Sequence, residues 1–192
     1  MASIITATTA NGLVSSADNS GVLQLASGTG NLVTIPAVTG TAMVSGNMPA
    51  FSAFSASNQT LSNATTTLIT LGTEEFDTNN NFSSSRFTPT VAGYYQINAG
   101  TLFASGNNMD YSQARLYKNG TGGTLLKISS YYSPAVAGKF SEQLNVISCI
   151  VSMNGTTDYL ELYGFGSSTS TLTVVGGASF YTYMQGVLVR AA

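Results

Sequence analysis

Few side chains in this sequence could perform acid–base or metal chemistry. The chain has no histidine, one cysteine and eight carboxylates among its 192 residues. Without histidine there is no Ser-His-Asp triad and no imidazole ligand, and a single cysteine cannot build a thiolate zinc site or an intrachain disulfide. The glycine-rich stretches lack the lysine that a phosphate-binding loop requires. We therefore predict no catalytic, cofactor or transition-metal site, and we expect that the protein is not an enzyme.

The densest group of carboxylates is Glu74, Glu75 and Asp77. A glycosidase needs two carboxyl groups that face one cleft, about 5–10 Å apart, whereas adjacent acids beside a strand are typical of a solvated edge. Asp77 is followed by the asparagines 79–81, and oxygen ligands of this kind suit calcium. The run lacks the alternating acids of a recognised calcium loop. We therefore predict no metal site, and calcium binding is left open.

Tyrosine is the residue type best suited here to binding a ligand without catalysis. Tyrosines form the pairs 94–95 and 131–132, and a further one follows the asparagines at 107–108. An exposed tyrosine beside asparagine and serine combines a flat apolar ring with hydrogen-bonding groups, which is typical of surfaces that bind glycans or proteins. The candidate ligand-facing residues are Tyr111, Tyr131 and Tyr132. Because strand alternation turns one member of each pair inward, ordinary packing is the alternative.

Charge excludes two classes of partner. Charged residues make up 7% of the chain, the net charge is −2, and no lysine or arginine precedes Arg86. Nucleic acids and anionic membranes are bound by dense basic clusters, so we expect neither partner. The apolar segment 144–151 is far shorter than the about 20 residues of a membrane-spanning helix, and its Cys149 is expected to be a buried, inert thiol. So few charges favour an obligate oligomer, because a monomer would be poorly protected against association.

The first 48 residues differ in character from the rest. They contain no aromatic residue and one charged residue, Asp18. Alternating apolar residues in 21–26 and 31–38, separated by a glycine-rich stretch, predict a β-hairpin. An isolated hairpin has too little bulk for a core of its own. We interpret 1–48 as an extended, β-rich arm that anchors the protein by pairing with copies of itself or with another protein, through Leu23, Leu25, Val33 and Ile35.

Residues 49–192 contain every phenylalanine and tyrosine of the chain. They divide into short strand-like runs separated by turn signals, among them the Asn-Gly pairs at 119–120 and 154–155 and the Gly-Gly pair at 176–177. Strands at this spacing predict an all-β sandwich or jelly roll, and no segment has the period of a long helix. We therefore predict a second, head domain at 49–192.

An ordered series of segments in this head resembles the C1q/TNF-like family. Gly93 and Tyr95 belong to its central part, where a phenylalanine precedes an Asn/Asp run and a later Gly-x-Tyr. Ile97 and Met184 stand where the family commonly has aromatics, and the collagen stalk of animal relatives is absent. The segments that carry the resemblance are 49–54 (PAFSAF), 69–97 (ITLGTEEFDTNNNFSSSRFTPTVAGYYQI), 114–120 (ARLYKNG), 151–164 (VSMNGTTDYLELYG) and 180–189 (FYTYMQGVLV).

The resemblance implies a ten-stranded jelly-roll sandwich that forms tight homotrimers. In the family, alternate aromatics pack between the two sheets and line the trimer axis; the alternative is a monomeric sandwich in which they are only core residues. A glycine at 93 also suits a tight turn with positive φ. The residues assigned to head-domain core and trimer packing are Phe51, Phe54, Phe76, Phe82, Phe87, Gly93, Tyr95, Phe180, Tyr183 and Gly186.

The arm carries a second resemblance. Residues 16–36 (SADNSGVLQLASGTGNLVTIP) are similar to segments of bacteriophage tail-fibre, head-fibre and other virion proteins. The first residues lack the basic and apolar regions of a secretory signal. We therefore expect a trimeric virion protein on the particle exterior, a capsid decoration or head-fibre protein attached to other virion proteins through its arm. The alternatives are a short tail-fibre or receptor-binding protein that binds host surface glycan, and a bacterial surface C1q-like protein.

Overall fold

The computed structural model describes residues 23–26, 32–35, 48–133 and 140–192. The chain divides into two compact units, Met1–Ala42 and Met43–Ala192. No helix in the described ranges is long and apolar enough to cross a membrane. We call these units the arm and the head; the boundary lies at 42/43, whereas 48/49 was predicted.

The arm contains one antiparallel strand pair, β1 (Leu23–Ala26) and β2 (Leu32–Ile35). Leu23 pairs with Ile35, and Leu25 pairs with Val33. The predicted pairing of these two segments is thereby confirmed. Their anchoring role stays a prediction, and the glycine-rich connection between them lies outside the described residues.

The head is built from strands joined by turns, as the composition predicted. Ten strands were expected, and the count is higher because several two- and three-residue segments at the sheet edges pair independently. The strands of the described head are β3 (Ala50–Phe54), β4 (Gln59–Leu61), β5 (Thr67–Leu68), β6 (Thr73–Asp77), β7 (Phe82–Ser83), β8 (Arg86–Phe87), β9 (Gly93–Lys118), β10 (Thr124–Tyr132), β11 (Phe140–Met153), β12 (Leu160–Ser168), β13 (Leu172–Val174) and β14 (Tyr183–Ala191).

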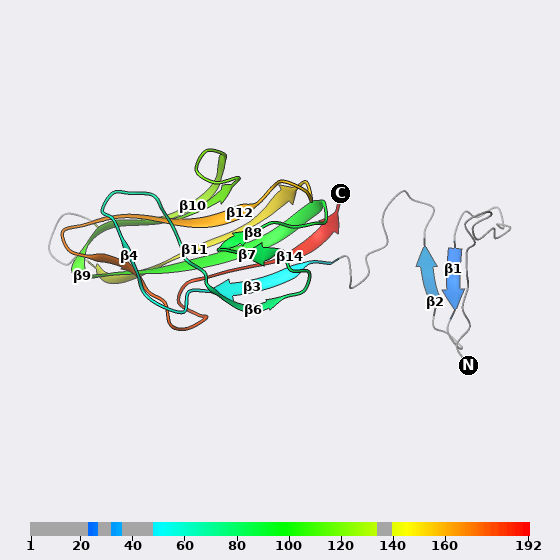
Figure 1. Cartoon of the computed structure of the whole chain (residues 1–192), viewed down its shortest axis with the longest axis horizontal. Helices are drawn as coiled ribbons and strands as arrows, with labels where there is room; N and C mark the ends of the chain where they lie inside the picture. Colours follow the sequence, from blue (N-terminus) through cyan, green and yellow to red (C-terminus); the bar gives the residue numbers. More distant parts are fainter. Residues whose placement is uncertain (1–22, 27–31, 36–47, 134–139) are drawn as a thin grey trace. The chain divides into compact units, whose positions relative to one another are not determined.

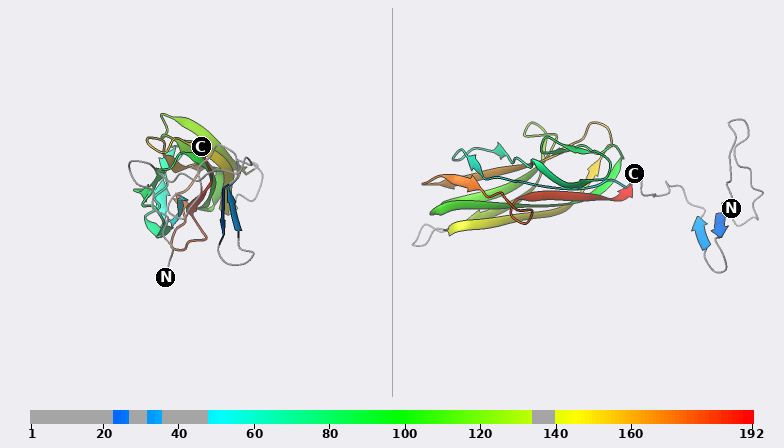
Figure 2. Two further views of the ribbon diagram at one scale, coloured as in Figure 1. Left: turned by 90° about the vertical axis from the view of Figure 1, so that its right-hand side faces the viewer. Right: turned by 60° about the horizontal axis from the view of Figure 1, so that its bottom comes forward.

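The long strand β9 holds the two layers of the head together. Its first part, residues 93–104, pairs with β14 and β11, and its second part, residues 109–118, pairs with β12 and β10. The first layer therefore has the order β6-β3-β14-β9-β11 and the second contains β10, β9 and β12. Gly106 lies between the two parts with φ of +46°, a backbone conformation that glycine adopts without strain. Figures 1 and 2 show these long strands running lengthwise through the head.

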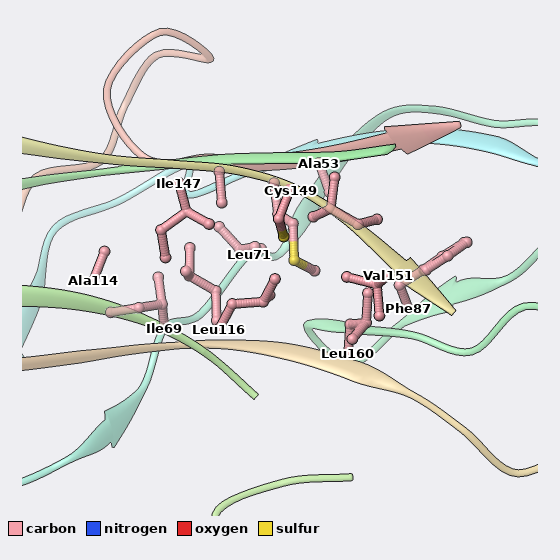
Figure 3. Close-up of a cluster of buried hydrophobic side chains, with 14 of the residues drawn as sticks. Ala53, Ile69, Leu71, Phe87, Ala114, Leu116, Ile147, Cys149, Val151 and Leu160 are labelled. Carbon is pink, nitrogen blue, oxygen red and sulfur yellow. The ribbon is translucent and has the colours of Figure 1, made fainter. Parts of the chain in front are cut away.

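Side chains from both layers meet in one core. Figure 3 shows Ile147, Cys149 and Val151 of β11 on one side, opposite Leu116 and Leu160 of the second layer. Each large apolar side chain buried in this way contributes about 2–3 kcal/mol before conformational entropy is subtracted. Cys149 is buried, as predicted from its apolar neighbours.

Four aromatic side chains form a cluster within the core. Phe51 stacks on Phe87 at 4.2 Å between ring centroids and on Phe82 at 5.2 Å, and Phe87 meets Tyr95 edge-on at 5.4 Å. The Tyr95 hydroxyl donates a hydrogen bond of 2.7 Å to the carbonyl oxygen of Val91. Burial raises the pKa of Tyr95 to about 12. The buried tyrosine is therefore neutral at physiological pH and keeps its only polar atom paired.

Two of the residues assigned to core and trimer packing lie outside the core of the single chain, and their role in trimer packing stays a prediction. Phe76 is 52% exposed on the edge strand β6, and Phe180 is 68% exposed in the segment between β13 and β14, where its ring contacts Tyr181 at 4.5 Å. Phe54 and Tyr183 are half-buried, and the ring of Tyr183 lies over Gly100. The other assigned residues, Phe51, Phe82, Phe87, Gly93, Tyr95 and Gly186, are buried.

The structure favours a glycine at position 93 for a different reason from the one predicted. Its φ is not positive, so the expected tight turn is wrong. A Cβ at this position would lie 2.3 Å from the carbonyl oxygen of Arg190 and 2.7 Å from Leu188 Cδ1. The glycine therefore allows β9 to start in close contact with the end of β14.

Candidate functional site

The carboxylate group at 74–77 serves the backbone. The Asp77 carboxylate accepts hydrogen bonds from the backbone N–H of Asn79 at 3.2 Å and of Phe82 at 2.7 Å, which closes the loop between β6 and β7. Glu75 accepts a 2.6 Å bond from the Ser52 hydroxyl. Within the described residues no three potential metal-ligating side chains converge. The geometry therefore assigns these acids to loop and edge structure.

The first layer presents an exposed apolar face. Along β14 and β11, one side of each strand points into the core and the other carries apolar side chains to the surface. Phe76 joins them, because it lines a depression of about 200 Å³ together with Gln96 and Val187. We define the apolar face by its exposed large side chains, which are Phe76, Tyr94, Leu144, Val146, Ile150, Val187 and Val189.

A short polar row crosses the apolar face. Gln96 Nε2 donates to Ser148 Oγ at 3.0 Å, and Ser148 Oγ donates to Asn98 Oδ1 at 2.8 Å. These amide and hydroxyl groups bond mainly to one another across β9 and β11. The polar row is therefore uncharged, and a partner that covered this row would not have to desolvate an ion.

The second layer presents a different surface, made of aromatic rings. On its outer side, Tyr111 of β9 contacts Tyr132 of β10 at 6.4 Å and Phe165 of β12 at 5.8 Å, both edge-to-face. The guanidinium of Arg115 lies 4.1 Å from the centroid of Phe165. Gln113 stands between Tyr111 and Arg115 on β9. We call Tyr111, Gln113, Arg115, Tyr132 and Phe165 the aromatic face.

Comparison with known proteins agrees with the geometry of the layers. No family model and no curated protein matches the chain. Among solved structures, murine APRIL at pH 8.5 is similar with a TM-score of 0.55 and 7% identity, covering 74% of this chain and 99% of its own. Eiger TNF from S. frugiperda is similar with a TM-score of 0.58 and 8% identity, covering 76% and 93%. The head is a TNF-like jelly roll. At these identities the likeness is one of fold alone.

In this TNF-like head, the predicted ligand-facing tyrosines separate. Tyr111 and Tyr132 are cross-strand partners on the aromatic face. Tyr131 pairs with Ser112 on the opposite side of the same strands, and its ring meets Phe140 of β11 at 4.9 Å. The sequence analysis did not predict that Phe165 of β12 and Arg115 of β9 belong to this surface. Alternation within each strand gives no sign that β12 lies beside β9.

An ion pair between an exposed guanidinium and a buried carboxylate joins β8 to β12 in the second layer. Glu161 is buried, and its Oε1 accepts bonds from Arg86 Nε at 2.9 Å and Nη2 at 2.7 Å. Its Oε2 accepts a 2.8 Å bond from the Tyr163 hydroxyl. Burial first, and then the bond to Glu161, raises the pKa of Tyr163 to about 12. Arg86 also lies 3.8 Å from the Tyr159 ring centroid. The carboxylate is thus satisfied by neighbours and is not free for catalysis.

A second ion pair joins the two Asn-Gly turns. Lys118 Nζ lies 2.6 Å from Asp158 Oδ2, and Asn119 Nδ2 donates to Asp158 Oδ1 at 3.1 Å. The backbone N–H of Asn154 donates to the same carboxylate at 3.0 Å. Burial alone would raise the pKa of Asp158, but the hydrogen bonds from Lys118, Asn119 and Asn154 outweigh it and lower that pKa. The predicted turns at 119–120 and 154–155 are confirmed and lie side by side.

Proposed function

We propose that the protein is a non-catalytic, homotrimeric structural protein of a virion, which assembles through the apolar face and attaches to other virion proteins through its arm. The observation that carries the proposal is the exposure of the apolar face. Its large side chains are between 41% and 62% exposed in the single chain. Soluble monomers rarely expose contiguous apolar patches larger than a few hundred Å².

The apolar face is suited to a permanent interface. It has amide and hydroxyl groups at its centre, and the chain as a whole has only 7% charged residues. Obligate interfaces are more apolar than transient ones and exclude charges from their core. The TNF-like fold favours three copies, since the family resembled here forms tight trimers, and a head-to-tail contact closes into a ring when its rotation is one third of a turn.

The virion role rests on the arm. Its β1–β2 pair and its lack of aromatic residues fit a segment that becomes part of a neighbouring protein's sheet, where backbone hydrogen bonds supply affinity. Three arms on one trimer would triple the points of attachment and raise the avidity. A capsid decoration or head-fibre protein on the particle exterior uses both features.

The aromatic face favours a second candidate, a receptor-binding tip that binds host surface glycan. Tyr132 is 68% exposed and lies beside a second tyrosine and a phenylalanine. Exposed aromatic rings in this arrangement are typical of surfaces that recognise a ligand. The two candidates differ in where the protein sits on the particle.

The test measures mass and location. Light scattering on the full chain is expected to give roughly three times the chain mass of 19.8 kDa, and a monomer mass would overturn the assembly proposal. Gold label on a C-terminal tag, viewed by electron microscopy on intact particles from the source, is expected over the capsid. Label confined to the tail would favour the receptor-binding candidate instead, and unlabelled particles would overturn the virion proposal.

A further inference from the structure

We propose that the aromatic face binds an acidic, linear polysaccharide, with Tyr132 and Tyr111 stacking against sugar rings and Arg115 binding a sugar carboxylate. The proposal deepens the receptor-binding candidate by naming its ligand class, and it rests on that candidate. One protomer supplies every residue of the aromatic face, so the binding site does not depend on the trimer.

The rings of the aromatic face form a continuous row across three strands. Tyr132 on β10 contacts Tyr111 on β9 with an angle of 62° between the ring planes, and Tyr111 contacts Phe165 on β12 with an angle of 78°. The Arg115 guanidinium lies over the Phe165 ring, at 4.1 Å from its centroid, so the 68% exposed ring of Tyr132 offers the most open face. The apolar C–H side of a pyranose ring packs on such a face, and a row of rings offers several positions to a chain of sugars.

A second row, of polar groups, runs beside the rings. Gln113 Nε2 donates to Ser130 Oγ at 2.9 Å and Gln113 Oε1 accepts from Arg115 Nε at 2.7 Å. Arg115 Nη1 donates to the hydroxyl of Thr66 at 2.7 Å. These bonds fix the direction of the guanidinium, and among the described residues its Nη2 hydrogens have no hydrogen-bond partner. Gln113 is itself buried and both ends of its amide are used in these bonds, so it positions Arg115. The exposed Ser130 hydroxyl and the guanidinium are the polar groups beside the rings that suit the hydroxyl rim of a sugar.

The charge of Arg115 selects an acidic sugar. Within the described residues the ion pairs join Arg86 with Glu161 and Lys118 with Asp158, and Arg115 belongs to neither pair. No carboxylate of the described residues therefore lies within ion-pair distance of its guanidinium. A guanidinium that is already held in place binds a carboxylate well, because the hydrogen bonds are charge-assisted and little entropy is lost. One cation between rings suits a polymer with separated carboxylates and is too few for nucleic acid.

The position of the site favours a linear polymer. The rows lie on the outer side of the β10–β9–β12 layer, where Tyr132 is largely exposed and Phe165 and Tyr111 are half-buried. An open sheet surface lets a chain enter and leave at both ends, whereas a single small ligand is held better in an enclosed pocket.

The binding test uses purified full-length protein, so it does not depend on where the protein sits on a particle. Immobilised alginate, polygalacturonate, hyaluronate and polysialate serve as acidic probes, dextran and amylose as neutral controls, and dextran sulfate as a control for charge alone. We expect retention on at least one carboxylate polymer and on neither neutral polymer. No retention on any carboxylate polymer would overturn the proposal, as would equal retention on neutral ones.

Variants separate the site from non-specific attraction. Tyr132→Ala and Arg115→Gln are each expected to weaken binding about ten-fold or more, as truncation of a central ring or charge does at binding sites. Phe180→Ala is the matched control, because Phe180 has the same 68% exposure as Tyr132 but lies away from the β10–β9–β12 layer. Since Tyr132 is largely exposed, its loss leaves the fold intact, which circular dichroism verifies. Equal losses in all three variants, or loss in none, would overturn the proposal.

If particles carry the protein on the capsid and the purified chain still binds a carboxylate polymer, the ligand assignment stands and only the tail location fails. If the label lies on the tail and the polymers do not bind, the receptor-binding candidate survives and the ligand class is wrong. The two failures are therefore distinguishable.

Discussion

Arg86 and Glu161 are 75 positions apart in the sequence, yet both Nε and Nη2 of the arginine donate to the same carboxylate oxygen, at 2.9 and 2.7 Å. The arginine side chain is 45% exposed, whereas that of the glutamate is 4% exposed. Because of this asymmetry, removal of the arginine leaves a buried carboxylate, whereas removal of the glutamate leaves a partly solvated guanidinium. The pair also joins the short strand β8 to β12, so its loss affects the packing of the second layer.

Replacing Arg86 with alanine is therefore expected to destabilise the head by about 2 kcal/mol, less than for a fully buried pair because the guanidinium is partly solvated. The buried Glu161 would keep the bond from Tyr163 but lose its counter-ion. Urea unfolding followed by circular dichroism measures the change. The double variant Arg86→Met/Glu161→Gln is expected to recover part of the loss, and a single-variant loss below about 0.5 kcal/mol would contradict this account of the buried charge.

Asp158 predicts how stability depends on acid pH. The pKa of its carboxyl group is lower in the folded head than in the unfolded chain. The unfolded value is about 3.9. The folded state therefore favours the ionised form, so the contribution is complete above the unfolded pKa and is lost as pH falls through the folded one. Unfolding free energies of the native chain and Asp158→Asn should differ at pH 7, and the difference should shrink as pH falls through the folded pKa. A difference that stays constant with pH would exclude a role of the charge.

The apolar face predicts a matched pair of assembly variants. Leu144 on that face and Leu125 on β10 are 42% and 40% exposed in the single chain. Leu144→Arg is expected to convert trimer into monomer, because an arginine without a partner cannot be buried in an apolar interface. Leu125→Arg is expected to leave the trimer intact. Analytical ultracentrifugation of both variants decides the matter, and dissociation by Leu125→Arg alone would place the interface elsewhere.

Gly93 and Gly72 provide a second matched pair. A Cβ at Gly93 would meet the backbone oxygen of Arg190 at 2.3 Å, whereas a Cβ at Gly72 would meet no atom within 4 Å. Gly93→Ala is expected to cost about 3 kcal/mol, because the end of β14 would have to move. Gly72→Ala is expected to be neutral or slightly stabilising, by up to about 1 kcal/mol. Thermal unfolding compares the two, and equal midpoints would refute the close approach.

Cys149 is expected to react slowly with alkylating reagents. Burial raises the pKa of its thiol, and the nearby positive charge of Lys127 opposes that shift only in part. Because the thiolate is the reactive form, both low exposure and a raised pKa slow the reaction. Mass spectrometry after iodoacetamide treatment should show about 100-fold slower labelling in buffer than in denaturing urea. Equal rates would indicate that the thiol is accessible in the folded head.

Much of the strand layout could be predicted from local patterns. Alternation in β11, where Ile147, Cys149 and Val151 face inward, is visible in the sequence and is kept in the structure. The Asn-Gly turns lie between β9 and β10 and between β11 and β12. Positive φ values of 64° at Asn119 and 72° at Gly120 explain the residue types of the first turn, and a φ of 70° at Gly155 explains the glycine of the second. The jelly roll was predicted from a series of segments that resemble the C1q/TNF-like family in the same order, although no single segment was specific.

Other features depend on which strand lies next to which. Alternation shows that a strand has two faces, but it does not show whether a face is covered by another layer, by another copy or by water. Phe76 and Phe180 were therefore assigned to core and trimer packing together, and the single chain shows only that they lie outside its core. The anchoring role of the arm and the trimer remain predictions for the same reason, since their partners are other chains.

By itself, the sequence determined that the head is made of strands and that its turns fall at glycine and asparagine. It also excluded histidine chemistry and chemistry that needs two thiolates. These conclusions follow from residue type and short-range periodicity. Only the tertiary structure decided that Tyr111, Arg115 and Phe165 form one surface and that Gly93 contacts the end of β14. Those arrangements arise from pairing between β9, β12 and β14, strands far apart in the chain, whose register is set by the packing of the whole core.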